Sequence, residues 1–205
     1  LIDDEAADPG IKRFLEIIFK QNNRLNALVE DLLDLSRIEQ GVIGDNWELQ
    51  NDLILPVLEN ARIACETLLA EKQIELKIFC STDIRARINQ PLLEQAIINL
   101  LTNAIKYSDD GSRVVIEVAQ LTEQVSIRVR DFGCGIEEEH LPRLFERFYR
   151  VDRARSRNLG GTGLGLAIVK HVAHAHRGEV IVSSTLGEGS SFTLLLPQIA
   201  NGLSD

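Results

Sequence analysis

Four short motifs follow one another between residues 99 and 166, and their order is the feature that most constrains the fold. They are Asn99-Leu-Leu-Thr-Asn103-Ala-Ile-Lys106-Tyr107, Asp131-Phe-Gly133-Cys-Gly135, Phe145-Glu-Arg-Phe148-Tyr149 and Gly160-Gly161-Thr-Gly163-Leu-Gly165-Leu. Each motif alone is a weak indicator. Because each combines polar or glycine residues with a flanking apolar segment, we expect the four to converge on one site of a folded domain.

The first motif places two amides inside an apolar helix. Asn99 and Asn103 are four residues apart and therefore share one helical face, with Lys106 and Tyr107 one turn further on. Ordinary surface asparagines are an alternative, but buried amides in an apolar run need hydrogen-bonding partners, which a ligand would supply. Amide oxygens suit Mg²⁺ and a lysine suits phosphate, so this face predicts a site for both.

The two glycine motifs fit the remaining parts of a nucleotide. Asp131 follows a predicted strand, and its carboxylate can accept a hydrogen bond from the adenine amine, while Gly133 and Gly135 let the backbone approach the base. Residues 160–165 lead directly into an apolar helix, whose free N–H groups attract phosphate. The spacing matches neither a Walker loop nor the dinucleotide fingerprint. A simple turn and a flexible loop are the alternatives.

Composition limits the class of protein. The chain has 205 residues, 44% of them hydrophobic, and a net charge of −9, which argues against nucleic acid or an anionic membrane as the main partner. Cys65, Cys80 and Cys134 form no CxxC pair, and we interpret them as buried thiols in a reducing compartment. The four histidines form no metal-ligand set, and we expect them on the surface or in the core. No segment reads as a membrane span or signal peptide.

The first 40 residues predict a long amphipathic helix. After a turn at Asp8-Pro9-Gly10, a helix is expected from Ile11 to Gln40, ended by Gly41. A heptad seam runs through Ile11, Phe14, Ile18, Gln21, Leu25, Leu28, Leu32 and Leu35. This stripe needs a partner. The helix either lies on the following domain or joins a dimeric bundle, and the regular seam favours a homodimer through residues 11–40.

The rest of the chain alternates between strand and helix patterns. We expect strands at 47–50, 74–79, 84–88, 114–118, 125–130, 179–184 and 191–196, and helices at 52–71, 91–107, 141–147 and 163–176. Residues 151–159 are polar and basic, and with Arg150, Arg153, Arg155 and Arg157 they form either a solvated segment or a lid over phosphates. The fold class is α+β, a two-layer α/β sandwich with helices on one face of a mixed sheet, preceded by the long helix.

These motifs resemble the N box, the first glycine box, the F box and the second glycine box of sensor histidine kinases. The closing segment Glu188-Gly-Ser-Ser-Phe192 is similar as well, and Leu32–Glu39 resembles the second helix of that family's dimerisation and phosphoacceptor domain. The resemblance runs from about Ile11 to Pro197. It implies a partial dimerisation and phosphoacceptor region at 1–41, a hinge at 42–46, an ATP-binding catalytic domain at 47–198 and a tail at 199–205.

The resemblance also implies the ligands and the residues that hold them. The cofactors are ATP and Mg²⁺, with Asn103 as the Mg²⁺ ligand. The ATP-binding residues it implies are Asn99, Asn103, Lys106, Tyr107, Asp131, Gly133, Gly135, Ile136, Phe148, Arg150, Gly161, Thr162, Gly163, Leu164, Gly165, Leu166 and Ser191.

The implied activity is that of a protein-histidine kinase, which passes the γ-phosphoryl group of ATP to a histidine and then to an aspartate of a response-regulator receiver domain. The family's phosphoacceptor segment is absent from residues 1–205, and the chain has no methionine. We therefore read it as an internal fragment with the acceptor upstream, unable to phosphorylate itself. We expect a cytoplasmic location, compatible with the cytosolic part of a membrane-anchored sensor, and no nucleic-acid or membrane contact by the fragment itself.

Two other functions fit the same motifs. The first is an ATP-hydrolysing relative of the gyrase and chaperone type, in which a glutamate precedes the metal-binding asparagine by four residues. This chain has Asn99 there, and an amide cannot take the proton of a water molecule. The second is a non-catalytic dimerisation scaffold, which would have no need of Asn103 or the glycine loops.

Overall fold

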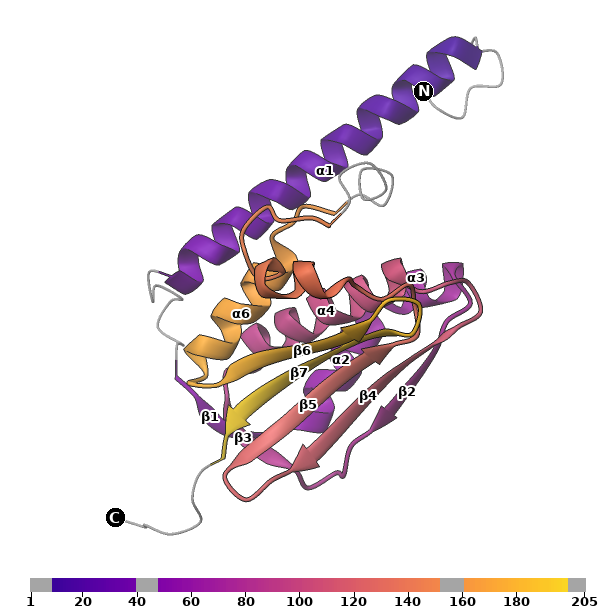
Figure 1. Ribbon diagram of the computed structural model, residues 1–205. Coiled ribbons are helices and arrows are strands. Elements are labelled where there is room, and N and C mark those ends of the chain that lie inside the picture. The colour runs from indigo at the N-terminus through magenta and orange to yellow at the C-terminus, as the bar shows by residue number, and fades with distance from the viewer. Residues whose placement is uncertain (1–8, 40–47, 152–160, 199–205) are drawn as a thin grey trace.

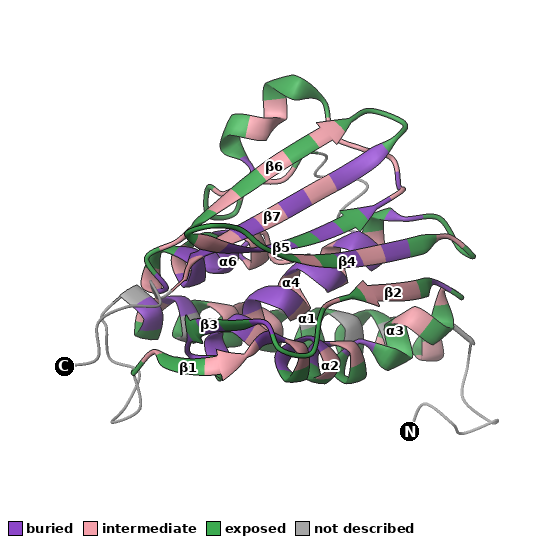
Figure 2. Cartoon of the chain, turned by 90° about the horizontal axis from the view of Figure 1, so that it is seen from below, coloured by how far each residue is buried: buried purple, intermediate pink, exposed green. Residues whose placement is uncertain are grey.

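Alternating apolar residues build the central strands of one mixed sheet. The computed structural model, which describes residues 9–39, 48–151 and 161–198, orders the strands β2-β4-β5-β7-β6. Their bounds are β2 Glu75–Phe79, β4 Arg113–Gln120, β5 Gln124–Asp131, β6 Glu179–Thr185 and β7 Gly189–Pro197. β2 and β4 are parallel, and the other neighbours are antiparallel. Buried residues alternate along most of β7 and along the second half of β5, as Figure 2 shows.

Helices cover one face of this sheet (Figure 1). They are α2 Ile54–Ala64, α3 Glu66–Glu71, α4 Gln90–Tyr107 and α6 Gly165–Ala175. Helix α4 lies at the centre and contacts α2, α6 and β5. It begins where it does because Asn89 Oδ1 accepts the Leu92 N–H at 3.2 Å, with Pro91 in the first turn. The predicted two-layer sandwich and the helix at 91–107 are confirmed.

A second, two-stranded sheet precedes α4. Strands β1 (Gln50–Leu53) and β3 (Arg85–Ile88) pair antiparallel. The strand expected at 47–50 is present but displaced: its ladder begins at Gln50 and runs through Asp52 and Leu53, and Trp47 lies outside the described residues. The single helix expected at 52–71 is also wrong. Its first two residues belong to β1, and the helix is divided into α2 and α3 at Cys65, whose φ of −97° and ψ of 2° are not helical.

Three further boundaries differ from the sequence pattern. The short helix expected at 141–147 is instead a 3₁₀ helix, η1, at Glu138–Arg143, where Pro142 has no N–H to form an α-helical bond to the Glu138 carbonyl. The helix expected from Gly163 begins at Gly165, since Gly163 has a φ of +80°, outside the right-handed helical region. Pro9 and Gly10, expected in a turn, are the first residues of α1.

Helix α1 (Pro9–Glu39) has two kinds of surroundings. Near its C-terminal end it contacts α6, with Leu35 and Ile38 buried and Leu28 packed against the same core. Towards the N-terminus it extends away from the sandwich (Figure 1) and leaves Phe14 and Leu25 about three-fifths exposed. Of the two alternatives for this helix, contact with the following domain is confirmed. Leu28 and Leu35, expected in the dimer seam, belong to that contact.

Some expectations concern segments outside the described residues. They are the hinge at 42–46, Arg153, Arg155 and Arg157 of the basic loop, and the tail at 199–205. Within the described ranges, none of the helices combines the length and the apolar character needed to cross a membrane.

His176 joins the end of α6 to the start of α4 and is 1% exposed. The Asn89 N–H donates to His176 Nε2 at 3.0 Å, so the ring proton lies on Nδ1, which donates to the Val172 carbonyl at 2.8 Å. The ring is therefore held as a neutral core histidine. Burial lowers the pKa of His176 below its ordinary value, although the hydrogen bond from Nδ1 to the Val172 carbonyl acts in the opposite direction.

This histidine predicts a loss of stability in mild acid. Because the pKa of His176 is lower in the folded than in the unfolded chain, the unfolded chain binds more protons below the unfolded pKa. We expect the free energy of unfolding by urea to fall as the pH drops from about 7.5 to about 5.5, by about 1.4 kcal/mol for each unit of pKa difference. In His176→Gln, which keeps an acceptor but cannot titrate, the fall should shrink. An exposed control, His174→Gln, should behave like the wild type, and equal falls in all three proteins would contradict the assignment.

Candidate functional site

A cavity of about 470 Å³ lies between α4, the start of α6 and the loops that follow β5 and η1. One edge of it is formed by α1. Most of the residues expected from the sequence line this cavity. They are Asn99, Asn103, Lys106, Tyr107, Asp131, Gly135, Ile136, Arg150, Gly161, Thr162, Gly163, Gly165 and Leu166. The described residues therefore bring all four sequence motifs to one place.

Helix α4 supplies the polar wall of the cavity. Its apolar residues are buried in the core, whereas Asn99 and Asn103 are partly buried and face the cavity. The first turn of α6 lies against this wall, because a Cβ on Gly165 would stand only 2.9 Å from Asn99 Oδ1. A glycine at 165 therefore allows the N-terminus of α6 to come close to the Asn99 amide.

Asp131 closes the far end of the cavity from strand β5 and is 6% exposed. The N–H groups of Gly133 and Ser190 donate to the same oxygen, Oδ1, at 3.0 and 3.1 Å. These two bonds fix the orientation of the carboxylate. Burial raises the pKa of Asp131, and the same N–H groups counteract that rise. Gly133 itself does not line the cavity and acts here through its N–H group.

Gly135 brings the loop after β5 against the end of β6. Its φ of +66° lies in the left-handed region, and a Cβ there would stand 2.0 Å from the Thr185 carbonyl oxygen. The close approach leaves the neighbouring Ile136 and Leu186 as apolar lining of the cavity.

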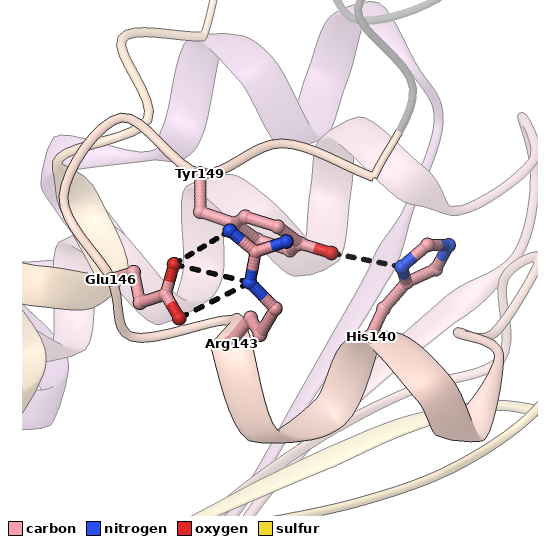
Figure 3. A network of polar contacts seen from close by, with 4 residues as sticks. All are labelled: His140, Arg143, Glu146 and Tyr149. Carbon is pink, nitrogen blue, oxygen red and sulfur yellow. Dashed lines mark hydrogen bonds and ion pairs between the residues drawn. The ribbon is translucent and has the colours of Figure 1, made fainter.

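The aromatic motif lines a third side of the cavity through Tyr149. Figure 3 shows the polar network around this side chain. The Tyr149 hydroxyl lies 2.8 Å from His140 Nδ1, and the Arg143 guanidinium lies 4.4 Å from the tyrosine ring centroid. Arg143 is in turn held by the Glu146 carboxylate at 2.9 Å. Phe148, which the resemblance placed near ATP, does not line the cavity and is 57% exposed.

The glycine loop before α6 is anchored at three points. Leu164 is fully buried and does not line the cavity. Its N–H donates to Thr162 Oγ1 at 3.2 Å, and the Thr162 hydroxyl donates to Asp31 Oδ2 of α1 at 2.6 Å. The Gly163 carbonyl accepts the Phe148 N–H at 2.9 Å. The described part of this loop is therefore tied to α1 and to the aromatic motif.

Two cationic side chains, Lys106 and Arg150, line the cavity near the glycine loop. Burial lowers the pKa of Lys106, the Asp31 carboxylate raises it, and Arg150 lowers it. The cavity therefore holds partly desolvated positive charge, which an anionic ligand would stabilise.

Several lining residues were missed from the sequence. Ser190 lines the cavity in place of the expected Ser191, because Ser191 pairs with Arg130 in the ladder and its neighbour Ser190 donates to Asp131. Because side chains alternate between the two faces along β7, the strand pattern could have indicated that Ser190, and not Ser191, faces the cavity. Thr102 lies three residues from Asn99 and could have been found by helical spacing. Nothing in the motifs pointed to Ala27 and Asp31, which come from α1.

The cysteines also differ from expectation. Cys65 is buried as expected, but Cys80 and Cys134 are only partly buried, and Cys134 lines the cavity. Cys134 lies in the turn between Gly133 and Gly135, and this turn places it at the cavity although a cysteine is apolar enough for the core.

Two family descriptions match the chain. Residues 88–200 match "Histidine kinase-, DNA gyrase B-, and HSP90-like ATPase", and residues 1–41 match "His Kinase A (phospho-acceptor) domain". The chain belongs to the sensor histidine kinases of this ATPase family. Residues 88–200 contain all four motifs that meet at the cavity, and the description they match is that of an ATPase domain.

Similar proteins agree with this assignment. Sensor histidine kinase RppB of Synechocystis sp. is 38% identical over 95% of this chain and 42% of its own length. Histidine kinase AdeS of Acinetobacter baumannii has a TM-score of 0.73 at 26% identity, covering 97% of this chain and 90% of that one. Full-length ShkA, solved in complex with AMPPNP, has a TM-score of 0.72 at 25% identity over 96% of this chain and 40% of that one. The chain spans less than half the length of RppB.

Cys134 offers a direct test of where the nucleotide binds. In a Cys80→Ser variant, N-ethylmaleimide should label Cys134, which lines the cavity, and spare the buried Cys65. Saturating ATP with Mg²⁺ should slow the labelling of Cys134 several-fold, because the nucleotide covers the thiol. Peptide mass spectrometry gives both rates, and labelling of Cys134 at one rate with and without nucleotide would place the nucleotide elsewhere.

Proposed function

We propose that this chain is the ATP-binding catalytic region of a sensor histidine kinase, which binds Mg²⁺–ATP in the cavity and transfers the γ-phosphoryl group to a histidine. The observation that carries the proposal is the single cavity shared by Asn103, Lys106, Asp131 and the glycine loop. These residues lie on separate elements and together offer a partner to each part of the nucleotide. Family membership and the ShkA complex with AMPPNP, an adenine nucleotide, support it.

Adenine would lie at the Asp131 end. Because Oδ1 already accepts two N–H groups, Oδ2 is the oxygen that would accept the exocyclic amine. Ile136 and Leu186 line the same end and would cover the faces of the ring. A buried carboxylate that meets a donor is favourable, whereas a carboxylate facing the O6 acceptor of guanine is not, so this end would select adenine.

The phosphates and Mg²⁺ would lie at the α4 and α6 end. Phosphate oxygens would meet Lys106, Arg150 and the N–H groups at the start of α6. The donor set fits Mg²⁺, since Asn103 offers an uncharged oxygen beside the expected phosphates. When bound, Mg²⁺ would neutralise charge on the transferring phosphoryl group. Asn103 is the residue we propose to hold it.

Phosphoryl transfer is favoured over hydrolysis by the chemistry of α4. The described residues of α4 that line the cavity are Asn99, Thr102, Asn103, Ala104, Lys106 and Tyr107, and none of them carries a carboxylate. Without a base on this wall, an attacking water would not be activated there. A histidine supplied from elsewhere needs less activation. We therefore propose that a histidine, and not water, accepts the γ-phosphoryl group.

The proposed partners follow from α1 and the family. We propose a homodimer through residues 11–40, because α1 exposes the apolar side chains of Ile11, Phe14, Ile18, Leu25 and Leu32 beyond its contact with the sandwich. The residues up to 41 would form the dimerisation and phosphoacceptor region, and 47–198 the ATP-binding domain. A response-regulator receiver domain would take the phosphoryl group. We propose that the chain works in the cytoplasm, where ATP is supplied.

The proposed function is tested by following ATP in two ways in one experiment. With Mg²⁺ and ATP labelled at the γ position, we expect binding with negligible phosphate release, and acid-labile label on the upstream phosphoacceptor helix once it is supplied in trans. Asn103→Ala should lose Mg²⁺-dependent binding, while Asn60→Ala, remote from the cavity on α2, should not. Steady phosphate release would instead support the ATPase alternative, and absence of binding would support the scaffold.

Asp131→Asn should weaken ATP binding by about 10- to 100-fold, the range expected when a buried polar partner is lost. The amide oxygen can still accept the Gly133 and Ser190 N–H groups, so the fold should survive, but the NH₂ group would face the adenine amine. The preference for ATP over GTP should shrink in parallel. Titration calorimetry measures both affinities, with Asp110→Asn as an exposed control. Equal ATP affinities in wild type and Asp131→Asn would exclude the adenine contact.

A further inference from the structure

Helix α1 contributes a negative charge to the cavity. Asp31 lies on α1, lines the cavity with Ala27, and is partly buried. Its Oδ2 accepts the Thr162 hydroxyl of the glycine loop at 2.6 Å. The residues are 131 positions apart in the chain, so the bond joins the long helix to the loop before α6.

Asp31 interacts with the same groups that we expect to contact the phosphates of a nucleotide. Thr162 belongs to the glycine loop that leads into α6, and Lys106 is the lysine expected to contact phosphate. The Asp31 carboxylate acts on both, as a hydrogen-bond acceptor for Thr162 and as the opposite charge that raises the pKa of Lys106 against the effect of burial. One anionic side chain therefore interacts with two groups that the proposed function assigns to the nucleotide.

The same stretch of α1 is held against the sandwich by apolar contacts. Leu28 packs on the core, Leu35 is 1% exposed and Ile38 is 7% exposed. Counting from Leu28, Asp31, Leu35 and Ile38 follow at steps of three, four and three, which places all four on one face of the helix. Docking of this face therefore carries the Asp31 carboxylate into the cavity.

We propose that Asp31 is an internal competitor of the nucleotide phosphates, so that docking of α1 and binding of ATP oppose each other. This inference rests on the proposed function. A triphosphate that binds Thr162 and Lys106 displaces the Asp31 carboxylate, which is also negatively charged. The contact between α1 and the glycine loop is lost with it. Because coupling between two binding events is reciprocal, whatever pulls α1 from the sandwich tightens ATP binding. The signal that moves α1 would thereby reach the nucleotide site through one side chain.

Asp31→Asn tests this competition by titration calorimetry of the 205-residue chain with Mg²⁺–ATP and with adenosine. The amide can still accept the Thr162 hydroxyl, so α1 should stay folded, but the competing charge is gone. We expect ATP to bind about five- to tenfold more tightly than to the wild type, within the usual range of coupling between sites. Adenosine, which has no phosphate, should bind with unchanged affinity.

Glu30→Gln is the matched control, since it removes the same charge from the neighbouring exposed position of α1, and should leave ATP affinity unchanged. Equal ATP affinity in the wild type and Asp31→Asn would overturn this inference alone, and weaker binding by Asp31→Asn would overturn it by showing that Asp31 assists the nucleotide. A similar gain in Glu30→Gln would reduce the effect to net charge and overturn it too. If no variant bound ATP or adenosine, the proposed function would fail first and this inference with it.

Discussion

Helix α4 must satisfy two environments at once, and the rest of the domain is arranged around that requirement. One face carries the apolar residues that contact α2, α6 and β5, and the other turns Asn99 and Asn103 to the cavity. A rotation of the helix would bury the amides among apolar side chains, where they lack partners. The packing of the hydrophobic core therefore sets the orientation of Asn99 and Asn103 towards the cavity.

The position of Asp131 in the sheet is likewise set by the fold itself. Its carboxylate is buried at the end of β5, a position that is unfavourable for a charge, and it is stabilised there by the N–H groups of Gly133 and Ser190. These donors lie 57 residues apart in the chain but meet because β5 pairs with β7. The polar group that would read the base is thus also a link between the loop after β5 and the start of β7.

The sequence predicted the parts of this molecule that depend on local pattern. The sandwich, α4 and the meeting of the four motifs follow from periodicity and from polar residues within apolar runs. The break at Cys65 did not, because the residues on both sides keep a helical pattern and the break depends on packing. The 3₁₀ form of η1 was missed because Pro142 is also compatible with the first turn of an α-helix that begins at residue 141. Asp31 was not readable at all, since a charged residue on a long helix looks like any solvated one until the helix is docked.

The division of α1 connects the two parts of the chain physically. Leu28, Leu35 and Ile38 hold one end of it on the sandwich, while the apolar side chains beyond remain exposed at the other end. A straight helix transmits a rotation along its length, because its hydrogen-bonded turns resist twisting. A partner that turned the exposed end would therefore also turn the docked end, where Asp31 accepts the hydroxyl of Thr162 in the glycine loop. In the proposed reaction, the position of α1 relative to this loop would therefore determine how a histidine approaches the phosphoryl group.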